Sequence, residues 1–372
     1  MPRVDGILTH QEIERLARTG CIQAGRELEP DQIQPTSLDL RLGSRAIRIR
    51  AGFLPGDQSV EACLADLSLY EIDLRAGAVF EPGQIYLVPL EERLEMADDL
   101  RARCNPKSST GRLDIFTRVI TDHHDRFDNI SPGYRGPIYL EVMPRSFPIR
   151  LRAGHRLNQV RFLAGQPRLS DQEHREAHRQ LELVTLSSGR PVDALDLEVD
   201  GGFYLRVSLE SDRPDGVISY RARRFTDVID LDRIGGHDPS IFFEPILASG
   251  GRLLLEPEEF YIFASRELIR VPPHLAAEMT AYDVGVGELR TNYAGFFDAG
   301  FGYGEHGERE GTRAVLEVRP HDVPFLIEDG QVLFKLEFSR TVTRCQRIYG
   351  GPGSTSSYAE QGLTLAKYFR ED

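Results

Sequence analysis

Residues 80–90 read FEPGQIYLVPL, and residues 255–265 read LEPEEFYIFAS. In each stretch a Tyr follows a Glu-Pro pair by four residues inside a short apolar run, and 175 residues separate the two stretches. A second pair follows in the same order: residues 137–165 and 313–340 each contain Leu-Glu-Val, a turn with Pro, a short apolar run, a Gly and an alternating strand. Because chance rarely gives two matches in one order, the sequence predicts a tandem duplication. The alternative is that two β-rich domains share only the pattern of their hairpins.

Most of the remaining chain has the pattern of short β-strands. Residues 37–43 (SLDLRLG) and 44–50 (SRAIRIR) alternate apolar and polar side chains, as half-buried strands do. The 34 Gly and 22 Pro indicate frequent turns between such strands. The sequence therefore predicts a mostly β protein of two similar domains with few short helices.

Two segments depart from the strand pattern. In THQEIERLARTG (9–20), Thr9 and Glu12 have capping-box spacing, which predicts a short helix that ends at Gly20. The charged stretch SDQEHREAHRQ (170–180) is the predicted linker between the copies. It is either a short solvated helix or an exposed connection.

The overall charge limits the classes of partner. The chain has 45 Lys and Arg against 58 Asp and Glu, a formal net charge of −13, which argues against a nucleic-acid binder. A local basic patch could still bind a small anionic ligand. No apolar run approaches the roughly 20 residues that span a bilayer, and the N-terminal sequence has no apolar core of signal-peptide type. We expect a cytoplasmic protein without a membrane partner.

Cysteine and histidine spacing predicts no metal site. The four cysteines form no CxxC pair, so no structural zinc site is expected. His123 and His124 are adjacent, and neighbouring residues on a strand point to opposite faces, so one ion would rarely bind both.

Residues 101–119 (RARCNPKSSTGRLDIFTRV) reverse the overall charge locally, because five cations face one acid, Asp114. Their centre, KSSTGR at 107–112, combines two hydroxyls, a Gly and two cations, which suit phosphate oxygens. The alternative is a solvated basic turn, and the segment is not a P-loop. The corresponding stretch of the second copy, 276–294, carries Arg290 against three acids and lacks the serine pair, so it is poorly suited to a polyphosphate.

Four carboxylates are candidates for chemistry. Glu141 and Glu317 lie in the matched Leu-Glu-Val strands. Such a Glu usually points outward as the polar half of the alternation, and the alternative is a pocket that raises its pKa. Asp128 and Asp298 lie in turns rich in Gly or Pro, where Asp often bonds only to the backbone.

At these motifs the sequence resembles the dCTP deaminase family, relatives of the trimeric dUTPases. Ser108-Ser109-Thr110-Gly111-Arg112 resembles the family's SSLxR-like phosphate motif. Pro132-Gly133-Tyr134-Arg135-Gly136 resembles the end of its hairpin A-H-x-x-D-P-G-W/Y-x-G. Glu141 lies nine residues after Pro132, where the family has its catalytic Glu.

Both ends of the chain also resemble this family, most closely its double-length form. ILTHQEIERL (7–16) and QPTSLDLRLG (34–43) are similar to the family's opening. SSYAEQGLTLAKYF (356–369) is similar to the tail that closes over the nucleotide, with Tyr358 and Gln361 in its Y-x-x-Q spacing.

The resemblance implies two tandem dUTPase-like (β-clip) domains, each a distorted β-barrel. They would comprise residues 1–170, with the phosphate motif, and 171–372, with the closing tail at about 350–372. In this family the active site forms between neighbouring subunits: one supplies the phosphate motif, and the other supplies the hairpin and the Glu.

The two copies depart from the family pattern in complementary ways. The first has a longer hairpin, ITDHHDRFDNISPG (120–133), so Asp128 no longer adjoins Pro-Gly. The second keeps the compact hairpin, with Ala294 and Asp298 at the family spacing, but lacks the Ser-Ser/Arg motif.

Two arrangements of the site remain open. In the composite site, the first copy supplies the phosphate motif and the second supplies Ala294, Asp298, Glu317, Tyr358 and Gln361. In the single-copy site, Glu141 and Asp128 complete the site of the first copy. The insertion GYGEHGEREGTR (302–313) before Glu317 argues against the composite site.

The resemblance implies hydrolytic deamination of dCTP to dUTP and ammonia, without zinc. The sequence lacks P-C-x-x-C, the cysteine half of the zinc-deaminase signature. The catalytic Glu would activate water at cytosine C4. Ser108 and a hairpin carbonyl near Ala294 or Thr121 would position that water.

The remaining roles follow from the same resemblance. Lys107 and Ser109 would bind phosphate, and Arg112 would hold charge. The hairpin Asp would bind the 3′-hydroxyl, and Phe296 or Tyr134 would exclude a 2′-hydroxyl. Mg²⁺ would bind through the triphosphate.

The resemblance leaves alternatives for function and assembly. They are a dUTPase, a bifunctional deaminase–diphosphatase, or a non-catalytic dNTP-binding regulator. A homo-oligomer is expected, of a number that the sequence does not give.

Overall fold

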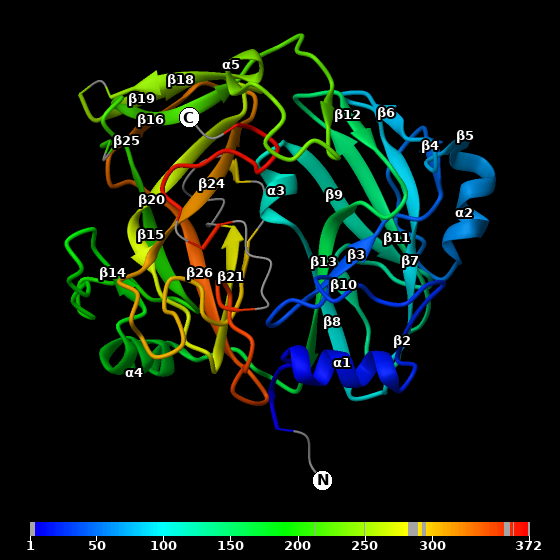
Figure 1. Cartoon of the computed structure of the whole chain (residues 1–372), viewed down its shortest axis with the longest axis horizontal. Helices are drawn as coiled ribbons and strands as arrows, with labels where there is room; N and C mark the ends of the chain where they lie inside the picture. The colour runs from blue at the N-terminus through cyan, green and yellow to red at the C-terminus, as the bar shows by residue number, and fades with distance from the viewer. Residues whose placement is uncertain are drawn as a thin grey trace.

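The computed structural model describes residues 4–211, 213–248, 250–281, 289–291, 295–352, 358–359 and 361–370. Two β-rich halves lie side by side, residues 4–170 on the right and 171–370 on the left of Figure 1, with one short helix, α3, between them. The described helices are α1 (His10–Arg18), α2 (Val60–Leu67), α3 (Ser108–Gly111), α4 (Asp171–Leu181) and α5 (Pro239–Phe242). The predicted mostly β fold with few short helices is confirmed.

The strands of the first half form two main sheets. Their orders are β1-β13-β8-β10, with β3 also on β13, and β5-β4-β7-β11-β9, with β2 also on β7. These strands are β1 (Gly6–Ile7), β2 (Ile22–Ala24), β3 (Leu38–Arg41), β4 (Arg45–Ile49), β5 (Ser68–Asp73), β6 (Ala78–Phe80), β7 (Tyr86–Glu95), β8 (Leu100–Pro106), β9 (Ile115–Thr121), β10 (Asn129–Ile130), β11 (Arg135–Pro144), β12 (Ile149–Leu151) and β13 (Arg156–Ala164).

The second half is built on one large sheet with the path β18-β16-β20-β15-β26-β21-β23, joined by β14, β22 and β24. Its strands are β14 (Val184–Thr185), β15 (Phe203–Ser208), β16 (Val217–Ala222), β17 (Ile229–Asp230), β18 (Phe243–Leu247), β19 (Arg252–Leu255), β20 (Tyr261–Ile269), β21 (Leu275–Ala281), β22 (Leu289–Thr291), β23 (Phe296–Phe297), β24 (Thr312–Pro320), β25 (Phe325–Glu328) and β26 (Val332–Arg340).

The sequence repeat reappears as a repeat of strand pairing. β7 pairs with β11 in the first half, and β20 pairs with β24 in the second, both antiparallel. The Glu-Pro…Tyr motif makes the same turn each time: the Glu81 amide donates to the Tyr86 hydroxyl over 3.3 Å, and the Glu256 amide donates to the Tyr261 hydroxyl over 3.0 Å. The repeated motif therefore sets the start of the same strand in both halves.

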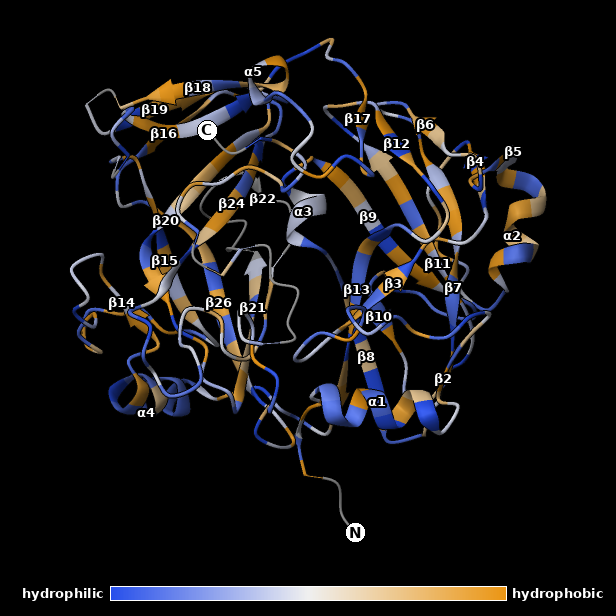
Figure 2. Ribbon diagram, viewed as in Figure 1, coloured by the Kyte–Doolittle hydropathy of each residue, from blue (hydrophilic) through white to orange (hydrophobic). Residues whose placement is uncertain are grey.

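The helices follow local signals. Thr9 and Glu12 form the predicted capping box of α1, and Gly20 just beyond it has a φ of +78°, which favours Gly. The predicted linker is a helix: α4 begins at Asp171, and its N-cap residue Ser170 forms a capping box with Glu173. Figure 2 shows α4 as mostly hydrophilic, as expected for a solvated connection.

One hydrophobic core extends from the first half into the second. Phe147 is fully buried and meets the rings of Phe242 and Phe243 edge-on, with centroids 5.8 and 5.2 Å away. Next to it β12 of the first half pairs in parallel with β17 of the second. Apolar burial thus holds the two halves together.

Replacement of Phe147 by Ala should lower the free energy of unfolding by about 3–5 kcal/mol, because it leaves a cavity in this shared core. Phe225→Ala is the control, since Phe225 is fully exposed. Chemical denaturation followed by circular dichroism measures both. An equal change in the two variants would contradict the shared core.

Candidate active site

A cavity of about 350 Å³ lies between the two halves. The first half lines it with residues of the phosphate-type motif, and the second half lines it with hairpin and tail residues. Among the residues predicted from sequence, the cavity brings together Lys107, Ser108, Ser109, Arg112, Asp298, Tyr358 and Gln361. The cavity therefore brings together the composite set except for Glu317, which does not line it, and Ala294, which lies outside the described residues.

The phosphate-type motif folds as the single turn α3, directly after β8. Thr110 anchors this turn, because its hydroxyl donates to the Leu157 carbonyl over 2.7 Å. Ser109 is buried and hydrogen-bonds Tyr368 of the tail, whose pKa burial raises. Ser108 is partly exposed on the cavity wall.

Arg112 is buried in this wall and is held by the tail. Its guanidinium donates to Gln361 Oε1 over 2.5 Å and to the Thr364 carbonyl over 3.0 Å, and lies 3.8 Å from the centre of the Tyr358 ring. Gln361 in turn donates to the Arg313 carbonyl over 2.9 Å. The Nε of Arg112 has no hydrogen-bond partner among the described residues. The tail thus closes on a first-half cation while bonding to the second half.

Glu317 lies behind the same wall, on β24 opposite Ile262 of β20. It is 1 % exposed, and its Oε2 finds no hydrogen-bond donor among the described residues. Val315, two residues earlier and so on the same face of the strand, lines the cavity. Burial raises the pKa of Glu317 to about 8, although the positive charge of Arg112 opposes the rise.

The expected outward orientation of both glutamates is wrong, since Glu141 and Glu317 are each 1 % exposed. The period-2 pattern assumes one solvated face, whereas every residue of β24 is buried. The second face of β24 is covered because the other half of the molecule lies against it.

Asp298 lies on the cavity wall in the compact hairpin of the second half. Its Oδ1 accepts hydrogen bonds from Arg161, over 3.1 Å, and from the Thr36 hydroxyl. Phe296 lines the cavity beside it. Ala294, predicted to supply a carbonyl here, lies outside the described residues, as do residues 282–288 of the stretch equivalent to the phosphate motif.

The single-copy set lies elsewhere: Glu141, Asp128, Thr121 and Tyr134 do not line the cavity. Glu141 accepts two bonds from Arg118, over 2.9 and 2.5 Å, and Arg118 stacks 3.7 Å from the Phe127 ring. The chain before α2 covers this pair, because a Cβ on Gly52 would lie 2.6 Å from Glu141 Oε2.

The other three members are engaged locally or buried. Asp128 accepts from the Val119 amide over 2.8 Å, and burial raises its pKa to about 7. The Tyr134 hydroxyl donates to the Pro137 carbonyl over 2.6 Å. Thr121 is 1 % exposed.

The insertion that argued against the composite site does not enter the cavity. Residues 302–313 do not line it. Arg270 binds the Gly307 carbonyl over 3.0 Å, and Arg309 of the insertion binds the Gly350 carbonyl over 3.2 Å.

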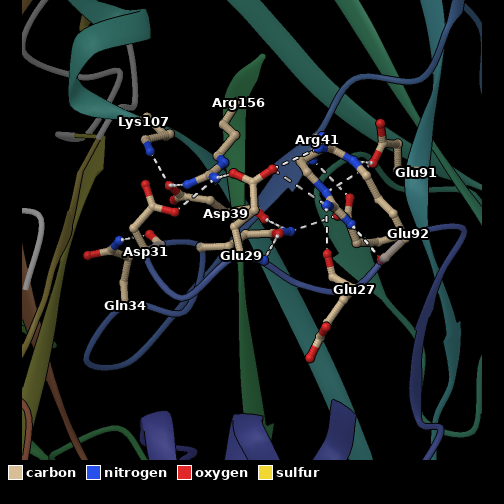
Figure 3. A network of polar contacts seen from close by, with 12 residues as sticks. Glu27, Glu29, Asp31, Gln34, Asp39, Arg41, Glu91, Glu92, Lys107 and Arg156 are labelled. Atoms are coloured by element: carbon tan, nitrogen blue, oxygen red, sulfur yellow. Dashed lines mark hydrogen bonds and ion pairs between the residues drawn. The ribbon is translucent and has the colours of Figure 1, made fainter. Parts of the chain in front are cut away.

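Sequence reasoning missed the charged network at the other end of the cavity (Figure 3). Lys107 and Arg156 both face the carboxylate of Asp39, which is 1 % exposed. Burial raises the pKa of Asp39 against the pull of these two cations. The available signal was SLDLRLG itself, where all four residues of β3 are buried, the polar Asp39 and Arg41 included.

Lys367 of the tail also lines the cavity and was missed. Burial and the nearby charge of Lys107 lower its pKa. Lys107, Arg156 and Lys367 therefore place three cations at this end of the cavity against two carboxylates, Asp31 and Asp39, which leaves its lining net cationic. Among the described residues, no three His, Cys, Asp or Glu side chains have the arrangement of a metal site. No described helix is long and apolar enough to cross a membrane.

Two family models match the chain in tandem. "2'-deoxycytidine 5'-triphosphate deaminase (DCD) N-terminal domain" matches residues 4–166, and "2'-deoxycytidine 5'-triphosphate deaminase (DCD), C-terminal domain" matches residues 170–369. A solved structure of 2'-deoxycytidine 5'-triphosphate deaminase from Agrobacterium tumefaciens is similar, with 46 % identity and a TM-score of 0.86. The match covers 92 % of this chain and 97 % of that one.

Two curated relatives each match less than half of the chain. The "dCTP deaminase, dUMP-forming" of Methanoculleus marisnigri is 31 % identical over 159 residues, which are 42 % of this chain and 79 % of that protein. The "dCTP deaminase" of Halorubrum lacusprofundi is 33 % identical over 153 residues, 40 % of this chain and 72 % of that protein.

The raised pKa of Glu317 predicts a pH-dependent stability. Its ordinary pKa is 4.5, so between about pH 4.5 and 8 the unfolded chain releases a proton that the folded chain retains, and stability falls as pH rises. Glu317→Gln removes this loss of stability at higher pH, because the amide does not ionise. The variant should therefore gain stability relative to the parent from about pH 5 to pH 8, by at most about 5 kcal/mol.

Denaturant titrations at both pH values measure the gain. Glu176→Gln makes the same change on the exposed face of α4 and serves as the control. A Glu317→Gln difference that stays constant with pH would contradict the assignment.

Proposed function

Since this chain belongs to the dCTP deaminase family, we propose that it removes the 4-amino group of dCTP by hydrolysis, giving dUTP and ammonia. It is an enzyme of that family. The observation that carries the proposal is one cavity, where the serine and arginine motif of the first half meets the hairpin and tail of the second. The buried carboxyl of Glu317 lies beside Arg112 at this wall.

The charge distribution orients the nucleotide. Lys107, Arg156 and Lys367 make one end of the cavity cationic, so the triphosphate lies there with Ser109. The base points to Arg112 and Glu317. The deoxyribose then lies against Asp298 and Phe296, where a carboxylate oxygen accepts from the 3′-hydroxyl and the ring fills the space of a 2′-hydroxyl.

Glu317 acts as the general acid and base. Its carboxylate takes a proton from the water that attacks C4, and this proton passes to N3 of the ring. The same carboxylate then takes the proton of the new C4 hydroxyl and passes it to the amino nitrogen. As the C4–N bond breaks, ammonia leaves and the water oxygen remains on C4 as the carbonyl. A pKa of about 8 suits this work, since a proton-transfer group is most effective near the working pH.

Arg112 and Ser108 assist this chemistry. The charge of Arg112 interacts with Glu317 and favours its ionised form. The Ser108 hydroxyl, on the cavity wall, holds the water. A zinc ion has no part in this proposal, because the sequence lacks the P-C-x-x-C pair that supplies the cysteine ligands in zinc deaminases.

Mg²⁺ would enter with the triphosphate. Asp39 fits this ion, because its carboxylate lies beside the cationic end and its Oδ1 lacks a partner among the described residues. It would accept a hydrogen bond from a water molecule of the hydrated ion, which commonly keeps several waters.

Glu317→Gln should lower kcat by at least about 100-fold, because it removes the proton-transfer group. Glu141→Gln is the matched control: its carboxylate is equally buried but bound to Arg118 outside the cavity, so kcat per folded molecule should stay within about threefold. Ammonia release from dCTP measures both, and circular dichroism gives the folded fraction. The reverse order of effects would favour the single-copy site.

A product assay tests the reaction itself. Purified protein with dCTP and Mg²⁺ should release ammonia and dUTP in equal amounts, without pyrophosphate. Ammonia with dUMP and pyrophosphate would indicate the bifunctional reaction. This is the second candidate because the Methanoculleus marisnigri relative is named "dCTP deaminase, dUMP-forming". A complete absence of ammonia would overturn the deaminase proposal.

A further inference from the structure

We propose that Arg161 is a positioning residue that sets how the site reads the sugar of its nucleotide. It belongs to β13 of the first half but acts on Asp298 in the hairpin of the second. The inference rests on the proposed function, because it takes Asp298 as the group that meets the 3′-hydroxyl.

Arg161 is 2 % exposed and satisfies all its guanidinium nitrogens with acceptors from both halves. Its Nη1 donates to the Ala277 carbonyl over 3.0 Å. Its Nη2 donates to Asp298 Oδ1 over 3.1 Å and to the Phe297 carbonyl over 3.4 Å. The remaining bonds go to the backbone and hydroxyl oxygens of Thr36 in the first half. One side chain therefore holds the backbone of β21 and β23 and the carboxylate of Asp298, which follows β23.

These contacts use one of the two carboxylate oxygens of Asp298. Arg161 and Thr36 both bind Oδ1, whereas Oδ2 takes part in no hydrogen bond among the described residues. Because Asp298 lines the cavity, its second oxygen is left for the ligand. The Arg161 guanidinium also lies 4.0 Å from the centre of the Phe296 ring, which lines the cavity beside Asp298. Both groups that would contact the sugar are thus oriented by one cation.

The fold itself does not require an arginine at this position. In the first half Arg161 pairs with Arg103, and the same register in the second half places Glu337 opposite Glu278. Burying a guanidinium costs several kcal/mol unless its donors are satisfied, so an apolar side chain would serve packing alone at least as well. Arg161 occurs in the first half, whose β13 contacts the Asp298 hairpin of the second half. This placement indicates that the arginine has a role at the site.

The neighbouring charges are consistent with this task. Burial lowers the pKa of Arg161, and the carboxylates of Asp298 and Glu278 oppose the shift. On its far side Arg161 lines a second cleft of about 530 Å³, together with Arg103 and Glu278. Arg161 therefore forms part of the partition between the candidate site and this cleft.

The test compares binding of dCTP and 2′,3′-dideoxy-CTP, which lacks the 3′-hydroxyl. Isothermal titration calorimetry measures both dissociation constants in a Glu317→Gln background, in which the proposed function predicts binding without turnover. Arg161→Lys keeps the charge but cannot reach all the acceptors. It should reduce the preference for dCTP by at least about tenfold, the amount expected for one hydrogen bond to a charged group.

Two further variants separate positioning from general structural damage. Asp298→Asn should reduce the preference similarly, and the double variant should show no further loss, because both changes remove one interaction. Arg270→Lys is the control, since Arg270 is a buried arginine that holds carbonyls and Glu182 away from the cavity. Its preference for dCTP should be unchanged.

Chemical rescue adds a readout that loss of folding would not give. Millimolar guanidinium should restore the preference for dCTP to Arg161→Ala through the second cleft, and urea at the same concentration should not. An unchanged preference in Arg161→Lys, additive losses in the double variant, or no preference in the parent would each overturn the inference. Failure of the proposed function appears separately, as an absence of ammonia in the product assay.

Discussion

Buried arginines that cross between the two halves are the interaction on which the site depends. Arg112 reaches from the first half to the tail, and Arg161 reaches to the hairpin of the second half. Arg319 reaches back from the second half to Asp114. Burial of a guanidinium is costly unless most of its donors find acceptors, so such contacts tolerate only a narrow range of relative positions. Apolar burial around Phe147 holds the halves together, and these arginines fix how they meet.

The two copies have diverged into different tasks on the same strand pairing. Glu317 and Glu141 occupy equivalent strands, β24 and β11, and both are buried. Each glutamate leaves its Oε2 without a partner among the described residues. Glu141 forms an ion pair with Arg118 and is covered by the chain before α2, whereas Glu317 forms no ion pair in the described part of the chain and its pKa is raised by burial. Identical backbone positions thus hold a structural ion pair in one half and a protonatable acid in the other.

Local signals in the sequence were sufficient to predict the helices and strands, but not which faces of the strands are buried. The capping pair of α1, the strand alternation and the Glu-Pro…Tyr turns depend on neighbours in the chain, so they could be predicted. The burial of Glu317 depends on what covers the second face of β24, which no periodicity records. The same holds for Arg161 and Lys367, whose partners lie far away in sequence. The complementary motifs allowed the composite site to be stated as one of two arrangements, because each copy lacked what the other had.

Because the two halves are covalently connected, formation of a site between them does not depend on protein concentration. One chain continues from β13 into α4, so both sides of the cavity belong to the same molecule. For separate subunits, the fraction of complete sites follows mass action and falls on dilution. In this chain the effective concentration of one half around the other is set by the connecting segment and does not change with the amount of protein. Completion of the cavity is therefore part of folding and does not require an encounter between molecules.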